Sequence, residues 1–427
     1  MSIIYDEKYK TITLHTRNTT YQMQIDRYGF LLHLYYGKTA EGCMDYLLTY
    51  YDRGFSGNPY EAETDRTYSM DALPQEFPSL GTGDYRTPAC IIKNTDRTYA
   101  SDFRYVSHTI KEGKYSLPGL PAVYADTDEA QTLEVVLADP VTGVQAVLLY
   151  GVLPQYDVIT RSVKIVNASK GHISVKKLAP ACLDLVGGAY DFITFYGRHA
   201  MERNCQRMPV GHGVAKIGSL RGTSSHQYNP AVILAEHDAT EDAGSCYAMT
   251  FVYSGGFQSE AGQDQYYQTR LLMGMSEEQF AYPLNPGEQF QSPEVILSYS
   301  SEGLSKLSQN MHRCIRSHLC RGKYKETVRP ILLNSWEASY FDFTGDSLLA
   351  LAQQAADLGI EMFVLDDGWF GKRDSDMRGL GDWVVNEEKL GCTLGELIEK
   401  INGMGLKFGI WIEPEMVNED SDLYREH

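Results

Sequence analysis

The chain has 427 residues, of which 43 % are hydrophobic and 22 % charged, a composition typical of a folded protein of two or three domains. Its net charge of −18 argues against binding to nucleic-acid phosphates or to an anionic membrane surface. The sequence contains no apolar run long enough to span a bilayer, and its first residues lack the features of a secretory signal. The eight cysteines are scattered without CxxC spacing, which favours free thiols, and we expect a cytoplasmic protein.

The first region, residues 1–302, has the pattern of an antiparallel β domain. Short runs of alternating or β-branched residues are separated by turn residues, which is typical of a large sandwich. These runs are residues 11–15, 21–25, 31–35, 132–137, 144–150, 158–166 and 231–235. The runs that flank residues 153–157 predict a hairpin. The polar stretch 51–87 has no clear period, and a loop of that length is usually functional or an interface arm.

Residues 303–321 predict a helix between two regions of different character. Leu304, Leu307, Met311 and Ile315 recur at helical spacing on one face. We therefore expect a helical linker over residues 303–328.

From Arg329 onward, short apolar strands alternate with helical segments. Strands are expected at residues 330–335, 360–365 and 406–410. Asp346 can cap a helix that ends near Gly359, and the sequence from Thr393 to Glu396 is a capping box that opens a second helix. Strands that alternate with helices predict a parallel sheet.

Polar and aromatic residues stand where each of these strands ends. They are Trp336 after the first strand, Asp366 and Asp367 after the second, and Trp411 and Glu413 after the third. In an α/β barrel or a doubly wound sheet, this edge carries the functional site. Aromatic faces pack on sugar rings and carboxylates accept hydrogen bonds from hydroxyls, so the pattern favours a carbohydrate site.

Two other interpretations of the carboxylates are less consistent with the sequence. Asp374 and Asp376 could join Asp366 and Asp367 in a cation site, but they lack the EF-hand pattern, and we expect no metal. A retaining glycosidase needs two carboxyl groups about 5–5.5 Å apart that flank the bond being cut. Asp366 and Asp367 follow the same strand, so they are better placed to bind two adjacent hydroxyls than to flank the bond being cut. Glu413 is expected to act as a supporting hydrogen-bond acceptor.

Several longer motifs carry a resemblance to a known family. They are Trp336-Glu-Ala-Ser-Tyr-Phe-Asp-Phe343, Leu365-Asp-Asp-Gly-Trp-Phe-Gly371, Phe408-Gly-Ile-Trp-Ile-Glu-Pro-Glu-Met-Val417 and, in the β region, Asp52-Arg-Gly-Phe-Ser-Gly-Asn-Pro59 and Ser224-Ser-His-Gln227. With these motifs the chain resembles the bacterial α-galactosidases of glycoside hydrolase family 36. The resemblance implies an N-terminal antiparallel β-supersandwich over residues 1–302, the linker 303–328, and the first three βα units of a (β/α)8 TIM barrel over residues 329–427.

The resemblance also implies an activity and a set of site residues. The family hydrolyses terminal α-galactosides such as melibiose and raffinose with retention, without cofactor or metal. Asp366 and Asp367 would hold galactose O4 and O6, and Trp336 and Trp411 would wall the same subsite. Two further residues, Asp52 and Arg66, match a loop that reaches a neighbour's site in the family's tetramers, so a homo-oligomer is expected. One departure is His199, which stands where relatives usually carry tryptophan.

The family's two catalytic residues have no counterpart in this sequence. The nucleophile is an aspartate of a Lys-Trp-Asp motif on the fourth barrel strand, and the acid/base is another aspartate near the sixth. Neither motif occurs before His427, so we expect a fragment that is inactive alone. A galactosyltransferase of the same family and a non-catalytic sugar-binding or assembly module stay open as alternatives.

Overall fold

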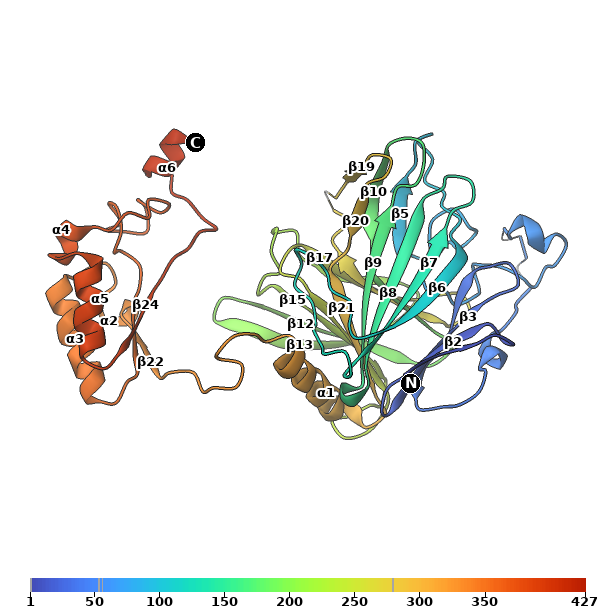
Figure 1. Ribbon diagram of the computed structural model, residues 1–427, viewed down its shortest axis with the longest axis horizontal. Helices are drawn as coiled ribbons and strands as arrows, with labels where there is room; N and C mark the ends of the chain where they lie inside the picture. The colour runs from blue at the N-terminus through green and yellow to red at the C-terminus, as the bar shows by residue number, and fades with distance from the viewer. Residues whose placement is uncertain (1, 53, 56, 279) are drawn as a thin grey trace. The chain divides into compact units, whose positions relative to one another are not determined.

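The computed structural model describes residues 2–52, 54–55, 57–278 and 280–427. Two residues of the Asp52–Pro59 motif, 53 and 56, lie outside the described residues. The chain divides into two compact units, Met1–Arg321 (unit 1) and Gly322–His427 (unit 2), shown in Figure 1. Within the described part of the chain, no helix is long and apolar enough to cross a membrane.

Unit 1 is built from antiparallel strands. In chain order they are β1 (Ile3–Asp6), β2 (Thr11–His15), β3 (Thr19–Ile25), β4 (Leu31–Lys38), β5 (Cys90–Lys93), β6 (Arg104–Glu112), β7 (Gln131–Ala138), β8 (Gln145–Leu153), β9 (Val158–Val166), β10 (Ile173–Leu178), β11 (Ala181–Leu185), β12 (Tyr190–Arg198), β13 (Met201–Pro209), β14 (Gly213–Gly218), β15 (Tyr228–Glu236), β16 (Cys246–Val252), β17 (Phe257–Gln263), β18 (Thr269–Met275), β19 (Tyr282–Leu284), β20 (Gln289–Gln291) and β21 (Glu294–Ser300). Three single-turn 3₁₀ helices join them: η1 (Asp45–Leu47), η2 (Tyr60–Ala62) and η3 (Pro154–Tyr156). The strands predicted from alternation coincide with β2, β3, β4, β7, β8, β9 and β15, and η3 closes the predicted β8–β9 hairpin.

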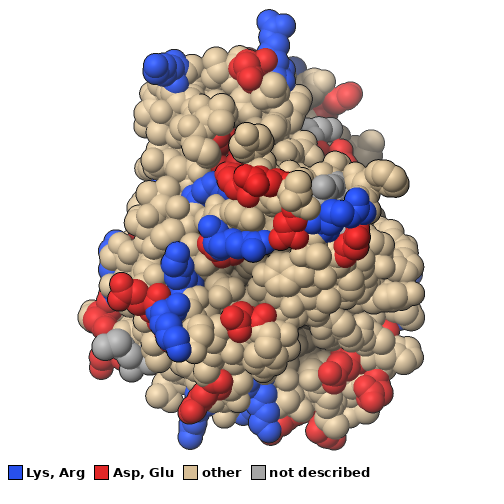
Figure 2. Space-filling model, turned by 90° about the vertical axis from the view of Figure 1, so that its right-hand side faces the viewer, with Lys and Arg blue, Asp and Glu red and all other residues tan. Residues whose placement is uncertain are grey.

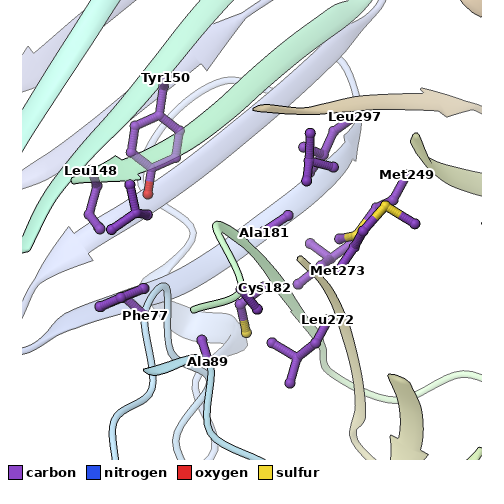
Figure 3. Close-up of a cluster of buried hydrophobic side chains, with 14 of the residues drawn as sticks. Phe77, Ala89, Leu148, Tyr150, Ala181, Cys182, Met249, Leu272, Met273 and Leu297 are labelled. Carbon is purple, nitrogen blue, oxygen red and sulfur yellow. The ribbon is translucent and has the colours of Figure 1, made fainter. Parts of the chain in front are cut away.

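The largest sheet runs β13-β12-β15-β16-β21-β9-β8-β7-β6, with β20 beside β9. Smaller sheets, β1-β2-β3-β4, β11-β18-β17-β14 and β19-β10-β5, complete the unit. Figure 3 shows side chains of different sheets meeting in one core: Leu148 and Tyr150 from β8, Cys182 from β11, and Met249 and Leu272 from β16 and β18. This is the predicted sandwich, in which facing sheets bury their apolar sides against each other.

Among its described residues, the predicted loop 51–87 contains one short element, η2. Its first part exposes Phe55 and Tyr60, whereas Tyr68, Met70 and Phe77 are buried further along. The segment therefore begins at the surface, enters the core of unit 1 in its middle part, and returns toward the surface at the exposed Tyr85. On the face of the molecule in Figure 2, acidic and basic side chains lie interspersed.

A buried ion pair crosses the core of unit 1. The side chains of Arg161 on β9 and Glu76 are 1 % and 0 % exposed, with 3.4 Å between Arg161 Nη2 and Glu76 Oε2. Tyr21, Tyr150 and His33 donate hydrogen bonds of 2.6–2.7 Å to the Glu76 carboxylate. Burial alone would raise the pKa of Glu76, but the Arg161 charge and the His33 hydrogen bond outweigh it, so the pKa is lowered.

The helix α1 (Gly303–His318) belongs to unit 1 by its contacts. Its buried side chains include Leu307 and Met311 of the predicted apolar face, together with Cys314. Met311 and Cys314 share a core cluster with Val252 of β16 and Ile296 of β21. Because this apolar stripe needs cover from water, the helix lies against the sheet.

Unit 2 contains three parallel strands and five helices. They are β22 (Leu332–Asn334), α2 (Trp336–Ser339), α3 (Gly345–Asp357), β23 (Met362–Leu365), α4 (Glu387–Leu390), α5 (Leu394–Gly403), β24 (Lys407–Ile410) and α6 (Asp422–Glu426). The two longest helices, α3 and α5, lie side by side against the sheet (Figure 1), and Leu348, Ala352, Leu397 and Ile401 are buried with the strand residue Phe363. The prediction of antiparallel β structure followed by parallel βα units is confirmed.

The helix caps confirm one sequence prediction and correct another. Thr393 and Glu396 form the predicted capping box at the start of α5. The prediction that Asp346 caps α3 is wrong, because Asp346 lies inside the first turn. Thr344 caps this helix instead: its hydroxyl accepts the N–H of Ser347, and the Ser347 hydroxyl accepts the N–H of Thr344. Thr344 lies two residues before Asp346 and occupies the cap position, which threonine also favours.

Replacing Arg161 tests the buried ion pair of unit 1. Arg161→Met should lower the free energy of unfolding by about 3–5 kcal/mol, because it leaves the Glu76 carboxylate buried without its cation. The control Arg27→Met removes an exposed pair with Asp65 and should cost less than about 1 kcal/mol. Urea unfolding followed by far-ultraviolet circular dichroism measures both, and equal losses would contradict the role given to Arg161.

The same pair predicts a pH dependence. Since folding lowers the pKa of Glu76 from its ordinary 4.5, its contribution to stability is fully present above that value. It is lost as the pH falls through the lower, folded pKa. The difference in unfolding free energy between Arg161→Met and the unaltered chain should therefore shrink in acid, and a difference independent of pH would contradict this assignment.

Candidate carbohydrate site

The register of the parallel sheet brings three strand ends to one edge. Asn334 pairs with Val364, and Val364 pairs with Gly409. The N–H of Ser335 donates to the carbonyl of Val364 at 3.0 Å, and the N–H of Trp411 donates to the carbonyl of Leu365 at 2.9 Å. The residues that follow β22, β23 and β24 are therefore fixed close together by backbone hydrogen bonds.

Asp366 lies directly after β23 and is largely buried. Asn334 Nδ2 donates to its Oδ2 at 2.5 Å, and the N–H of Asp367 donates to its Oδ1 at 2.7 Å. Its own N–H donates to Ser335 Oγ. An ionised carboxylate offers about four acceptor positions, so each oxygen of Asp366 retains room for a further donor.

Asp367 is held by a guanidinium. Arg373 Nε lies 3.0 and 3.1 Å from Asp367 Oδ1 and Oδ2, and Arg373 Nη2 donates to Oδ2 at 2.7 Å. The N–H of Gly368 also donates to Oδ1. The side chains of Arg373 and Asp367 are only 5 % and 6 % exposed, so this is a buried, charge-assisted pair.

Two half-buried tryptophans flank the carboxylates along the chain. The ring of Trp336 meets the rings of Tyr340 and Phe341 edge to face, with centroids 5.1 and 5.0 Å apart. The backbone carbonyl of Trp411 accepts a 2.9 Å hydrogen bond from the indole N–H of the buried Trp369. Both tryptophans are therefore anchored by neighbours while part of each ring remains exposed.

Glu413 and Lys389 add charge around the site. Burial, followed by the nearby charge of Glu415, raises the pKa of Glu413, and the Arg373 charge opposes this shift. Lys389 Nζ donates to the carbonyls of Phe341 and Gly368 at 2.7 and 2.9 Å, and burial lowers its pKa. Lys389 thus ties the segment after α2 to the segment after β23.

The remaining predicted residues lie in unit 1. Arg66 Nη2 is 2.9 Å from Asp52 Oδ1, and both side chains are more than half exposed, at 56 % and 63 %. His199 is exposed in the turn between β12 and β13. The structure therefore gathers Trp336, Asp366, Asp367 and Trp411 in unit 2 and pairs Asp52 with Arg66 in unit 1.

Sequence reasoning missed the residues that hold the carboxylates. Asn334 and Arg373 donate directly to them, and Asn418 accepts a hydrogen bond from Arg373. Asn334 could have been noticed as an amide at a strand end. Across the described residues, no group of three or more His, Cys, Asp or Glu side chains could hold a metal ion.

Family profiles cover almost the whole chain. The glycosyl hydrolase family 36 N-terminal domain matches residues 29–285, and the Melibiase domain matches residues 289–427. The chain belongs to glycoside hydrolase family 36. Among curated relatives, this family 36 chain is 64 % identical over its full length to the bifunctional alpha-galactosidase/sucrose kinase AgaSK of Mediterraneibacter gnavus, covering 46 % of that protein. It is 43 % identical over its full length to alpha-galactosidase Mel36A of Lactobacillus acidophilus, covering 58 %.

Solved structures of family members share the fold. The galactosidase domain of AgaSK superposes with a TM-score of 0.98 at 64 % identity, covering 100 % of this chain and 59 % of that one. A doubly substituted variant of the α-galactosidase AgaA of Geobacillus stearothermophilus, in complex with raffinose, gives a TM-score of 0.95 at 42 % identity, covering 98 % of this chain and 58 % of that one. The family 36 chain therefore spans about half the length of the curated relatives that it matches.

Glu413→Gln tests the electrostatics of the site. Because folding raises the pKa of Glu413 above its ordinary 4.5, the stability linked to this group is full below that value and falls as the pH rises through the folded pKa. A neutral glutamine avoids this loss, so the variant should be more stable than the unaltered chain near neutral pH and equal to it in acid.

The measurement is urea unfolding followed by tryptophan emission, which reports unit 2 because all four tryptophans lie there. Glu399→Gln, at an exposed position of α5, is the matched control and should leave stability unchanged at both pH values. A destabilised Glu413→Gln at neutral pH would show that the carboxylate is favourably placed, against this account.

Proposed function

We propose that this chain is part of an α-galactosidase, and that the strand-end edge of unit 2 binds the terminal α-linked galactose. The observation that carries the proposal is the pair of adjacent carboxylates, Asp366 and Asp367, each fixed by its own partner and flanked by Trp336 and Trp411. Fixed carboxylates accept hydrogen bonds from two neighbouring hydroxyls, and indole faces cover the apolar side of a sugar ring.

The substrates follow from the chemistry and from the relatives. Two doubly substituted variants of AgaA of Geobacillus stearothermophilus have been solved, one in complex with raffinose and the other with stachyose. We assign this chain to the same class: retaining hydrolysis of terminal α-galactose in oligosaccharides such as raffinose and melibiose. In this assignment Asp366 and Asp367 receive galactose O4 and O6.

In this proposal, Asp366 and Asp367 bind the sugar and do not cut the bond. They leave the same strand end, whereas a retaining pair flanks the bond at about 5–5.5 Å. The nucleophile and the acid/base come from residues outside these 427, so the chain alone does not turn over substrate.

Three segments of the chain take different parts in the proposed enzyme. Residues 1–302 form the β-supersandwich, 303–328 the linker, and 329–427 the first three βα units of the barrel. The enzyme is a homo-oligomer, in which the exposed pair of Asp52 and Arg66 reaches the site of a neighbouring copy. It works in the cytoplasm on a galactoside substrate.

Galactose binding tests the proposal directly. Tryptophan emission of the 427-residue chain should change on titration with galactose and should change less with glucose, which differs at the O4 hydroxyl. Asp366→Asn and Asp367→Asn should each weaken galactose binding about tenfold or more, about 1.4 kcal/mol, because a charge-assisted hydrogen bond becomes a neutral one.

The matched control is Asp376→Asn, which alters an exposed carboxylate of the same loop and should leave the affinity unchanged. A parallel assay with p-nitrophenyl α-galactoside should give no turnover from the chain alone. Failure of the folded chain to bind galactose would overturn the proposed function, and turnover abolished by Asp366→Asn would overturn the binding role of the carboxylates.

A further inference from the structure

Arg373 contributes more to the site than a neutralising charge. We propose that Arg373 is the positioning residue of Asp367: its guanidinium fixes the orientation in which this carboxylate accepts a sugar hydroxyl. The inference rests on the proposed function, because it concerns how the same site binds galactose.

The hydrogen bonds around Asp367 fix the orientation of its carboxylate. Three N–H donors reach Asp367: the backbone of Gly368, Arg373 Nε and Arg373 Nη2. Arg373 Nε is shared between Oδ1 and Oδ2, so the guanidinium contacts both oxygens of the carboxylate. Asp366 differs, since its two oxygens accept from two separate donors, Asn334 Nδ2 and the N–H of Asp367.

The guanidinium is itself held in place from several directions. Arg373 Nη1 donates to Asn418 Oδ1 at 2.9 Å and to the backbone carbonyls of Asp376 and Arg378 at 3.0 and 3.1 Å. Asn418, which follows β24, also accepts the N–H of Leu380. Groups from the loop after β23 and from the segment after β24 thus hold the arginine in place. Through Arg373 they also fix the orientation of Asp367.

The backbone of the loop packs closely against Arg373. Gly379 has a φ of +76°, and a Cβ at this position would lie 2.9 Å from the backbone nitrogen of Arg373. Glycine is therefore required where the loop turns back over the arginine. A rigid holder of this kind fixes the ligand-binding group before the ligand arrives.

Other charges face Asp367, but they do not replace Arg373. Asp366 precedes it in the chain, Glu413 approaches from the segment after β24, and Lys389 lies on α4. The two acidic groups repel the Asp367 carboxylate, and Lys389 Nζ donates to two backbone carbonyls. Arg373 is the cation in direct contact with the Asp367 carboxylate.

A buried ion pair is weak evidence for stability by itself, because the cost of removing both charges from water can exceed their attraction. The forked geometry of arginine instead supplies orientation, which lysine cannot reproduce. Arg373→Lys therefore separates the two roles, since it keeps a positive charge and loses the fork.

The test measures galactose dissociation constants of the 427-residue chain by tryptophan emission at neutral pH. Arg373→Lys should raise the dissociation constant about tenfold, by loss of one oriented charge-assisted hydrogen bond. Arg378→Lys, whose side chain pairs with Asp374 and Asp420, is the control and should leave the dissociation constant unchanged.

A second comparison guards against a variant that folds poorly. In an Asp367→Asn background no carboxylate remains for Arg373 to orient, so adding Arg373→Lys should not weaken binding further. Urea unfolding followed by tryptophan emission establishes that each variant is folded.

The outcomes separate this inference from the proposed function. Unchanged affinity in Arg373→Lys, or an equal further loss in the Asp367→Asn background, would overturn the positioning role alone. No galactose binding by the unaltered, folded chain would overturn the proposed function and this inference with it.

Discussion

The parallel pairing of β22, β23 and β24 in a single register is the constraint on which the site depends. Because the three strands run the same way and end together, the residues that follow them share one edge. Asn334 can then reach Asp366, and the carbonyl of Trp411 can receive the indole N–H of Trp369. A shift of one strand by a single residue would reverse its side chains and separate these partners.

Both units place an arginine against a buried carboxylate, with different consequences. In unit 1, Glu76 is surrounded by Arg161, two tyrosines and a histidine, so its acceptor positions are used inside the core. In unit 2, Arg373 contacts both oxygens of Asp367 at the strand-end edge. The same chemical pair therefore lies in the sandwich core in one unit and, in the proposed function, orients a sugar-binding carboxylate in the other.

The sequence predicted what local periodicity and strand ends encode. Alternation located strands such as β7 and β9, and the ends of β23 and β24 indicated Asp366 and Trp411. The cap of α3 was misassigned because Thr344 and Asp346 are both good caps, and the backbone path selects one. Arg373 was missed because its role depends on how the long loop after β23 folds back, which no local pattern specifies.

The most direct test of the account is a crystal structure of the 427-residue chain with galactose. The account predicts a sugar ring between Trp336 and Trp411, with its hydroxyls on the carboxylates of Asp366 and Asp367 and with Arg373 still bound to Asp367. Galactose seated elsewhere, with this edge of the sheet free of sugar, would contradict it.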